Sequence, residues 1–233
     1  MSLFSKQVSP EIAELIWQGR HRLLQGGRPR PQKLTATVLF TDLEGFSGQA
    51  EIQEPPSVLS WLNDYLAGMS ATAMEHRGVV KQFVGDSVMA VFGVPFPRTQ
   101  PEQWQADAVQ AVRCALAMER ALQDLHARWA AQGHPTLRMR IGIHTGPVVS
   151  GILGSGDRQE YMVVGDTVNT ASRLESHDKA RVISELGDRC CRIFISEQTH
   201  QLLGDRFATL VVGTISLKGK TKPITVHAVL GER

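Results

Sequence analysis

The sequence predicts an α+β sandwich, in which helices pack on one largely antiparallel sheet. Short apolar segments that suit strands alternate with longer segments of helical periodicity, such as residues 57–76 and 103–131. The connections between the predicted strands are of both kinds, tight hairpins and longer crossovers. The 233 residues suffice for one large domain with a substantial core.

The first strand, residues 35–41, is apolar and β-prone and ends at the carboxylate of Asp42. Gly45 permits a tight backbone after the strand, and Ser47 is expected to cap a following helix. A strand that ends in an acid beside free N–H groups suits a metal ion that carries a polyphosphate. The next element, residues 57–76, is a helix with one apolar face.

Residues 79–84 and 87–92 form a hairpin, with Gly85-Asp86 at its tip. If this hairpin lies beside the first strand, Asp42 and Asp86 face each other and can share two divalent ions. Taken singly, either aspartate would be an ordinary turn residue.

The rest of the chain continues the mixture of helices and strands. The apolar spacing of residues 103–131 predicts a long helix that packs on the core. The further elements are a strand at 138–144, a turn at 145–147 into a strand at 148–153, a strand at 159–164, a helix at 167–176 with Asp166 as N-cap, a strand at 192–195, a helix at 197–203, and strands at 210–217 and 224–230.

The N-terminal segment, residues 1–33, differs from the domain at 34–233. Residues 11–24 suit a short amphipathic helix, which the glycines and prolines of 26–31 break. This segment is either a connector to something upstream or a disordered tail.

Composition and charge limit the kinds of partner and the cellular compartment to expect. The net charge of +2 argues against nucleic acid or an anionic membrane as a partner. The three cysteines include an adjacent pair and do not suggest a disulfide framework, so a reducing cytosol is expected. The sequence has no apolar run of membrane-spanning length and no signal-peptide core, so we expect a cytoplasmic chain with no membrane contact of its own.

A second group of candidate residues lies in the C-terminal half. Asn169 and Arg173 are four residues apart on one predicted helix, and an amide beside a guanidinium suits a phosphoryl transition state. The alternative is a solvated helix surface. Lys220, beside a glycine, and Arg140, on the polar face of its strand, are weaker candidates for phosphate contacts, whereas His144 is interpreted as structural.

Five segments together resemble the class III nucleotidyl cyclases, the adenylyl and guanylyl cyclases. They are V-L-F-T-D-L-E-G-F-S, F-V-G-D-S-V-M-A-V-F-G, R-M-R-I-G-I-H-T-G, V-V-G-D-T-V-N-T-A-S-R-L-E-S and L-K-G-K, in the family's order over about residues 34–230. The resemblance implies a ferredoxin-like catalytic fold and a homodimer with two active sites at its interface. Residues 3–14 resemble the segment that follows the membrane anchor in bacterial cyclases with an extracellular CHASE-type sensor, so the full-length protein is expected to be a membrane-anchored receptor.

The resemblance also assigns roles to the candidate residues. The ligands of two Mg²⁺ or Mn²⁺ ions would be Asp42, Asp86 and the carbonyl of Leu43. The groups that hold the substrate phosphates would be the backbone N–H groups of Gly45, Phe46 and Ser47, with Arg140 and the partner's Lys220. The partner's Asn169 would orient the ribose, and the partner's Arg173 would stabilise charge at the α-phosphate.

The base-recognition positions depart from the family. Adenylyl cyclases usually have lysine where this chain has Gln82, and Asp or Thr where it has Met162. Lys81 is adjacent but would point to the opposite face of its strand, and Gly85-Asp86 is expected to hold the register. Because an amide can serve adenine or guanine by flipping, we predict ATP as the main substrate with relaxed selectivity.

The sequence leaves several other functions open. One is a guanylate cyclase or a dual-specificity purine nucleotide cyclase. Another is an inactive nucleotide-binding module that only relays a signal. A diguanylate cyclase would share the metal chemistry, but the chain lacks the G-G-D/E-E-F signature.

Overall fold

The computed structural model describes residues 19, 24–25, 28–155, 158–177, 186–187, 189–216 and 223–233. The predicted helix at 11–24 lies almost entirely outside this set, and the segment 3–14 that resembles a CHASE-type connector lies wholly outside it. Leu24 does not end a helix, because it lies in a short strand, β1 (Leu24–Gln25), that pairs with β2 (Arg28–Pro29).

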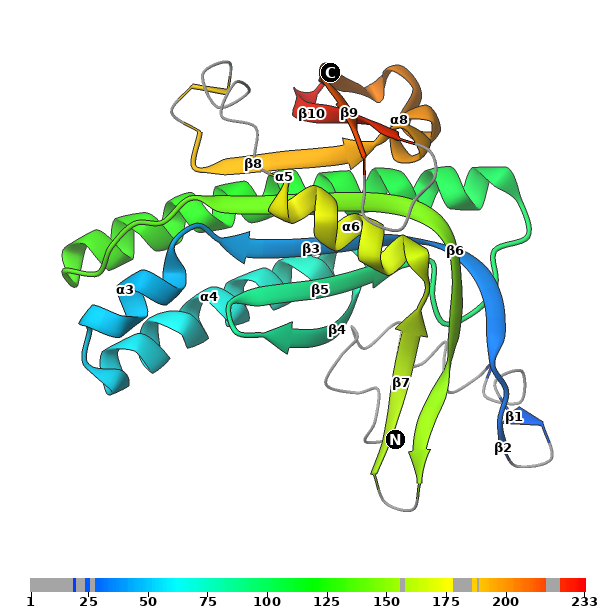
Figure 1. Cartoon of the computed structure of the whole chain (residues 1–233), viewed down its shortest axis with the longest axis horizontal. Coiled ribbons are helices and arrows are strands. Elements are labelled where there is room, and N and C mark those ends of the chain that lie inside the picture. Colours follow the sequence, from blue (N-terminus) through cyan, green and yellow to red (C-terminus); the bar gives the residue numbers. More distant parts are fainter. Residues whose placement is uncertain are drawn as a thin grey trace.

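The predicted α+β sandwich with a mostly antiparallel sheet is confirmed (Figure 1). An eight-stranded sheet has the order β4-β5-β3-β6-β8-β10-β9, and β7 pairs with β6. Among the described strands of this sheet, β6 and β8 form the one parallel pair. The strands are β3 (Gln32–Leu43), β4 (Val79–Val84), β5 (Ser87–Phe92), β6 (Met139–Ser155), β7 (Arg158–Val164), β8 (Cys191–Ser196), β9 (Phe207–Ile215) and β10 (Ile224–Glu232).

Helices cover both faces of the sheet (Figure 1). They are α3 (Phe46–Ile52), α4 (Pro55–Glu75), α5 (Pro101–Ala131), α6 (Asp166–Ser176), α8 (Glu197–Leu203) and the short 3₁₀ helix η1 (Gly204–Arg206). The residues of β3 alternate between the two faces: Leu39 packs with α4 and α5 in the larger core, and Val38 packs with Ala171 of α6 in a second core. Within the described part of the chain, none of the helices combines the length and apolarity that crossing a bilayer requires.

Helix α6 lies very close to strand β6. A Cβ atom added to Gly142 would lie 2.2 Å from the backbone nitrogen of Glu175 and 2.3 Å from the carbonyl oxygen of Ala171. Glycine is therefore required at this position of β6, because a methyl group would push α6 off the sheet.

The turn predicted at residues 145–147 is wrong, since β6 runs through it without a break. Thr145 and Pro147 pair with Thr37 and Thr35 of β3, so twelve residues of sheet pairing outweigh the local turn signal. Pro147 lies between the part of β6 that pairs with β8 and the part that pairs with β7, where β6 has a neighbour on one side only. Proline is tolerated at such edge positions.

Two predicted helix caps are also wrong. Gly45, with φ of 76°, is the N-cap of α3, and Ser47 lies inside the first turn. Gly165 is the N-cap of α6, and Asp166 is the first helical residue. Glycine is a common alternative to a side-chain cap, because it adopts the backbone conformations that a tight entry into a helix requires.

Candidate active site

Asp42 and Asp86 meet at one edge of the sheet, as the sequence predicted. Strands β3 and β5 are neighbours, with Thr41 opposite Val88, so the end of β3 lies beside the hairpin tip. The N–H of Leu43 donates to Asp86 Oδ2 over 2.8 Å. Burial and the negative charge of Asp42 raise the pKa of Asp86, against that hydrogen bond, which lowers it. Two close carboxylates with too little positive charge nearby form a good ligand set for divalent cations.

Arg140 is the cation beside these acids. It lies directly opposite Asp42 in the β3–β6 pairing, and its guanidinium donates to Asp42 Oδ2. Its Nε lies 3.0 Å from Glu175 Oε1, so one guanidinium contacts two carboxylates. Arg140, expected on a phosphate, is therefore held at the site by acids of its own chain.

Glu175 is a residue that the sequence reasoning missed. It lies on α6, its side chain is 9% exposed, and the Nη2 of Arg192 donates to its backbone carbonyl over 2.9 Å. Burial and the charge of Asp42 raise the pKa of Glu175 to about 7, although Arg140 and Arg192 lower it. Its position in the quoted L-E-S segment, two residues after Arg173, was the available signal.

A buried hydroxyl pair supports the end of β3. Thr41 Oγ1 and the hydroxyl of Tyr65 share a hydrogen bond of 2.8 Å, and both residues are fully buried. Beyond Asp42, the ring of Phe46 packs 5.1 Å from that of Trp61. These contacts hold Asp42 and the following loop in place from two helices, α3 and α4.

The C-terminal candidates are not brought to the acid pair within one chain. Asn169 is exposed and Arg173 is half-buried, both on α6. Among the described residues, neither of them forms a hydrogen bond or an ion pair with Asp42 or Asp86. Lys220 lies outside the described residues, so its role stays a prediction.

The base-recognition positions lie on β4 and β7. Gln82 is exposed and Lys81 is buried, but exposure does not alternate along β4, so the opposite faces expected for these two side chains stay a prediction. The pairing with β5 shifts by one residue between Val80 and Gln82, which was not predicted, while the register from Gln82 to the turn is regular. The ammonium of Lys81 lies 5.1 Å from the ring centre of Tyr161, the residue before the half-buried Met162.

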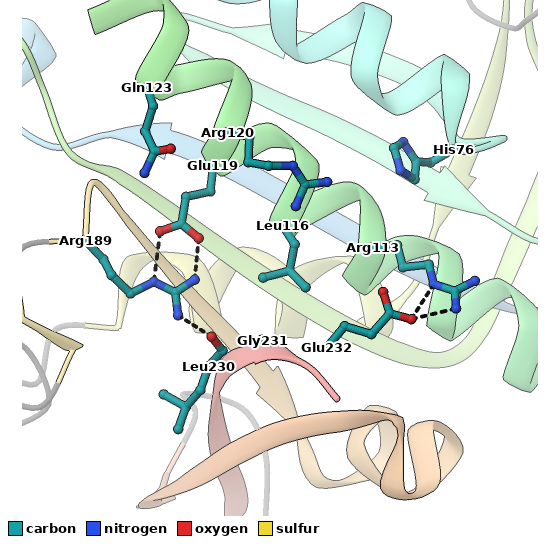
Figure 2. Close-up of a pocket in the computed structure, with 10 residues that line it drawn as sticks. All are labelled: His76, Arg113, Leu116, Glu119, Arg120, Gln123, Arg189, Leu230, Gly231 and Glu232. Carbon is teal, nitrogen blue, oxygen red and sulfur yellow. Dashed lines mark hydrogen bonds and ion pairs between the residues drawn. The ribbon is translucent and has the colours of Figure 1, made fainter.

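A cavity of about 620 Å³ lies elsewhere, between α5 and the end of β10 (Figure 2). None of the predicted site residues lines it. Two ion pairs border it: Arg189 binds Glu119, with Nε to Oε1 at 2.8 Å, and Arg113 binds Glu232 at 2.6 Å. Arg189 also donates to the carbonyl of Leu230, so its groups are used in holding β10 to α5.

Comparison with known proteins agrees with this geometry. A family model described as the adenylate and guanylate cyclase catalytic domain matches residues 29–230. Adenylate cyclase 1 of Rhizobium meliloti is 33% identical over 218 residues, which are 94% of this chain but 30% of that protein. The chain therefore spans less than a third of that relative's length.

Solved structures of both substrate types are similar to the chain. The adenylyl cyclase CyaB from P. aeruginosa has a TM-score of 0.77 at 35% identity, covering 88% of this chain and 97% of that one. The guanylyl cyclase Cya2 has a TM-score of 0.75 at 34% identity, covering 87% of this chain and 94% of that one. The two similarities are nearly equal, so similarity alone does not select a nucleotide.

Proposed function

Because the chain belongs to the family of adenylate and guanylate cyclase catalytic domains, we propose that it is an adenylate cyclase, a lyase that converts ATP to 3′,5′-cyclic AMP and pyrophosphate. The observation that carries the proposal is the meeting of Asp42 and Asp86 beside Arg140. This arrangement combines carboxylates for cations with a guanidinium for phosphate oxygens.

The acid pair fits the metal ions that the family resemblance implies, because burial and mutual repulsion leave Asp86 with a raised pKa that a cation would lower. Two Mg²⁺ or Mn²⁺ ions held by Asp42, Asp86 and the Leu43 carbonyl would neutralise phosphate charge and acidify the ribose 3′-hydroxyl. The N–H groups of Gly45, Phe46 and Ser47 would bind the outer phosphates.

Arg140 would turn from Asp42 toward the phosphates when the nucleotide binds, while Glu175 keeps hold of its Nε. A guanidinium held at one edge by a carboxylate keeps its other N–H groups aimed in a fixed direction. The 3′-hydroxyl then attacks the α-phosphorus in line, and pyrophosphate leaves.

We propose that the site is completed in a homodimer. Asn169 of the partner subunit would orient the ribose, the partner's Arg173 would stabilise charge at the α-phosphate, and the partner's Lys220 would hold the terminal phosphates. What supports the proposal is that, in the described part of the chain, neither Asn169 nor Arg173 forms a hydrogen bond or ion pair with Asp42 or Asp86 of the same chain. A monomer is then expected to be nearly inactive.

For the base, we propose ATP as the main substrate with relaxed selectivity. The exposed amide of Gln82 would face the purine and could flip to suit either base, whereas Lys81 is engaged with the ring of Tyr161. Met162 offers no useful hydrogen bond to a base edge. A guanylate or dual-specificity cyclase remains the second candidate, favoured by the similarity to the guanylyl cyclase Cya2.

The sensor context is a separate proposal. An upstream CHASE-type sensor, with the chain as its cytoplasmic catalytic part, is supported only by the resemblance of residues 3–14. The boundary between a connector at 1–33 and a catalytic domain at 34–233 likewise stays a prediction; β3 begins two residues earlier, at Gln32.

The first experiment measures cyclic AMP and cyclic GMP made by the purified chain from ATP or GTP with Mn²⁺, over a range of protein concentrations. We expect cyclic AMP to dominate and specific activity to rise with concentration. A tenfold preference for GTP in kcat/KM would overturn the choice of ATP. Bound nucleotide with no product from either substrate would favour the signalling module instead.

A complementation assay tests the shared site. Asp86→Asn and Arg173→Ala chains should each be inactive alone, because each lacks one half of every site. Random mixing puts half of the chains into mixed dimers with one intact site each, so about a quarter of wild-type activity should return. No recovery from a mixture that forms dimers would contradict a site built from both subunits.

A further inference from the structure

A second cluster of metal-ligating side chains lies far along the sheet from the acid pair. Among the described residues, Glu197, His200 and His227 bring one ligand atom each to within 4.8 Å of one another. Glu197 and His200 are three apart on α8, so they share a face of that helix. His227 comes from β10, opposite Ile195 in the pairing with β8. Two elements distant in sequence therefore converge on this point.

The three side chains are already in contact. Glu197 Oε2 lies 2.6 Å from Nε2 of His227, and the rings of His200 and His227 stack 4.0 Å apart and parallel within 2°. The side chain of His227 is 6% exposed and is held firmly, whereas that of Glu197 is 35% exposed and has room to move. His227 is thus a fixed ligand and Glu197 an adjustable one. His200 is half-buried.

Hydrogen bonds from neighbouring side chains orient the proposed ligands, as is common in metal sites. Nε2 of His200 lies 3.1 Å from Thr209 Oγ1 on β9, which leaves Nδ1 as its ligating nitrogen. Gln201 Nε2 donates to Glu197 Oε1 over 3.0 Å and leaves Oε2 for a cation.

We propose that Glu197, His200 and His227 form a binding site for one Zn²⁺ ion per chain, separate from the catalytic metals. Two imidazoles and one carboxylate suit zinc, which binds such sets with a fourth position left to water. The oxygen-only set at Asp42 and Asp86 suits Mg²⁺ or Mn²⁺ instead. The two sites therefore select different ions by ligand chemistry.

Binding requires one local rearrangement. A metal lies in the plane of each imidazole that ligates it, so two parallel rings cannot bind one ion. The half-buried ring of His200 would turn out of the stack. The proton held between His227 Nε2 and Glu197 Oε2 would pass to solvent as the metal takes its place, with the remaining proton of the neutral His227 ring on Nδ1. The ion would then link α8 to β10.

The test is calorimetric titration of Zn²⁺ into the intact chain in excess Mg²⁺, which occupies the oxygen-only site. We expect about one Zn²⁺ per chain, and a loss of affinity of at least about tenfold in His200→Gln and in His227→Gln. His200→Gln is the decisive variant, because the Glu197–His227 pair persists in it and the fold should be kept. His76→Gln is the matched control, since His76 is also half-buried on a helix end but contacts the carbonyl of Thr72 instead.

Thermal unfolding gives an independent readout. Zn²⁺ should raise the Tm of the wild type and of His76→Gln, and leave that of His200→Gln unchanged. A wild type that takes up no Zn²⁺ in excess Mg²⁺, or a His200→Gln chain that binds it as tightly, overturns the proposal. Neither readout depends on cyclase turnover, so the proposed function stands or fails separately.

Discussion

Two charged clusters of the molecule differ in the balance between their carboxylates and their arginines. Where β3 ends, three carboxylates, Asp42, Asp86 and Glu175, outnumber two guanidinium groups: Arg140 contacts Asp42 and Glu175, and Arg192 donates to the carbonyl of Glu175. The pKa values of Asp86 and Glu175 are raised. Beside the cavity at α5, one carboxylate, Glu119, is paired with one guanidinium, Arg189 (Figure 2). The remaining N–H groups of Arg189 donate to backbone carbonyls of β10. The first cluster is short of positive charge, and the second is balanced.

The difference separates function from stability. A set of partly buried acids that outnumbers its cations costs folding free energy and persists where a ligand supplies the missing charge. A balanced pair needs no ligand and serves to join elements, here α5 to β10. The presence of arginines and a cavity at α5 is therefore weaker support for a catalytic site than the imbalance at Asp42 and Asp86.

The largest effect should come from removing one acid of the unbalanced cluster. Asp86→Asn should lower kcat roughly 100- to 1,000-fold, because a metal ligand is lost. The free energy of unfolding without metal should stay equal or rise, since the amide oxygen can still accept from Leu43 and repulsion with Asp42 disappears. Assays of cyclic nucleotide and urea unfolding measure the two effects.

Asp124→Asn, the same change at an exposed position of α5, is the control for Asp86→Asn and should alter neither quantity. If Asp86→Asn lowered stability and left activity intact, Asp86 would be a structural residue and the contrast between the clusters would fail.

The balanced cluster should respond in the opposite way. Arg189→Ala leaves Glu119, 10% exposed, without its partner and should cost about 3 kcal/mol of unfolding free energy. Activity per folded chain should be unchanged. In Arg113→Ala, whose pair with Glu232 is about 40% exposed on both sides, the expected cost is below about 1 kcal/mol. Equal costs for the two variants in urea titrations would contradict the role of burial.

Glu175 should make the free energy of unfolding depend on pH. Its pKa is raised from 4.5 to about 7 in the folded chain, so the folded state binds more protons than the unfolded state between these values. Stability therefore falls as pH rises from about 4.5 to 7, by up to about 3 kcal/mol. Glu175→Gln should remove this part of the slope when urea unfolding is followed across pH in a chelator. If the unfolding free energies of wild type and variant changed with pH in parallel, the pKa of Glu175 would not be raised in the folded chain.

The smallest effect should come from the hydrogen bond between Tyr65 and the end of β3. Tyr65→Phe removes the hydroxyl that bonds Thr41 and should cost about 1 kcal/mol of unfolding free energy. Because Asp42 remains anchored by β3 and by Arg140, kcat should fall only a few-fold. A loss as large as that of Asp86→Asn would make the hydroxyl pair part of the catalytic machinery.

Local patterns in the sequence determined much of this molecule. The bounds of β4, β5 and α8 match the predicted residues, because each is delimited by neighbouring turn or cap residues such as Gly85-Asp86 and Ser196. Asp42 and Asp86 were predicted together because each follows an apolar strand, and the edge where they meet depends only on those strands being neighbours.

Only the tertiary structure decided the rest. The strand order places β6 between β3 and β8, and this brings Arg140, Glu175 and Arg192 together from three separate elements. The same pairing continues β6 without a break through 145–147, and the tertiary structure places the ammonium of Lys81 over the ring of Tyr161. Local signals act over a few residues, whereas these contacts are fixed by pairing between distant segments, whose free energy no short stretch of sequence contains.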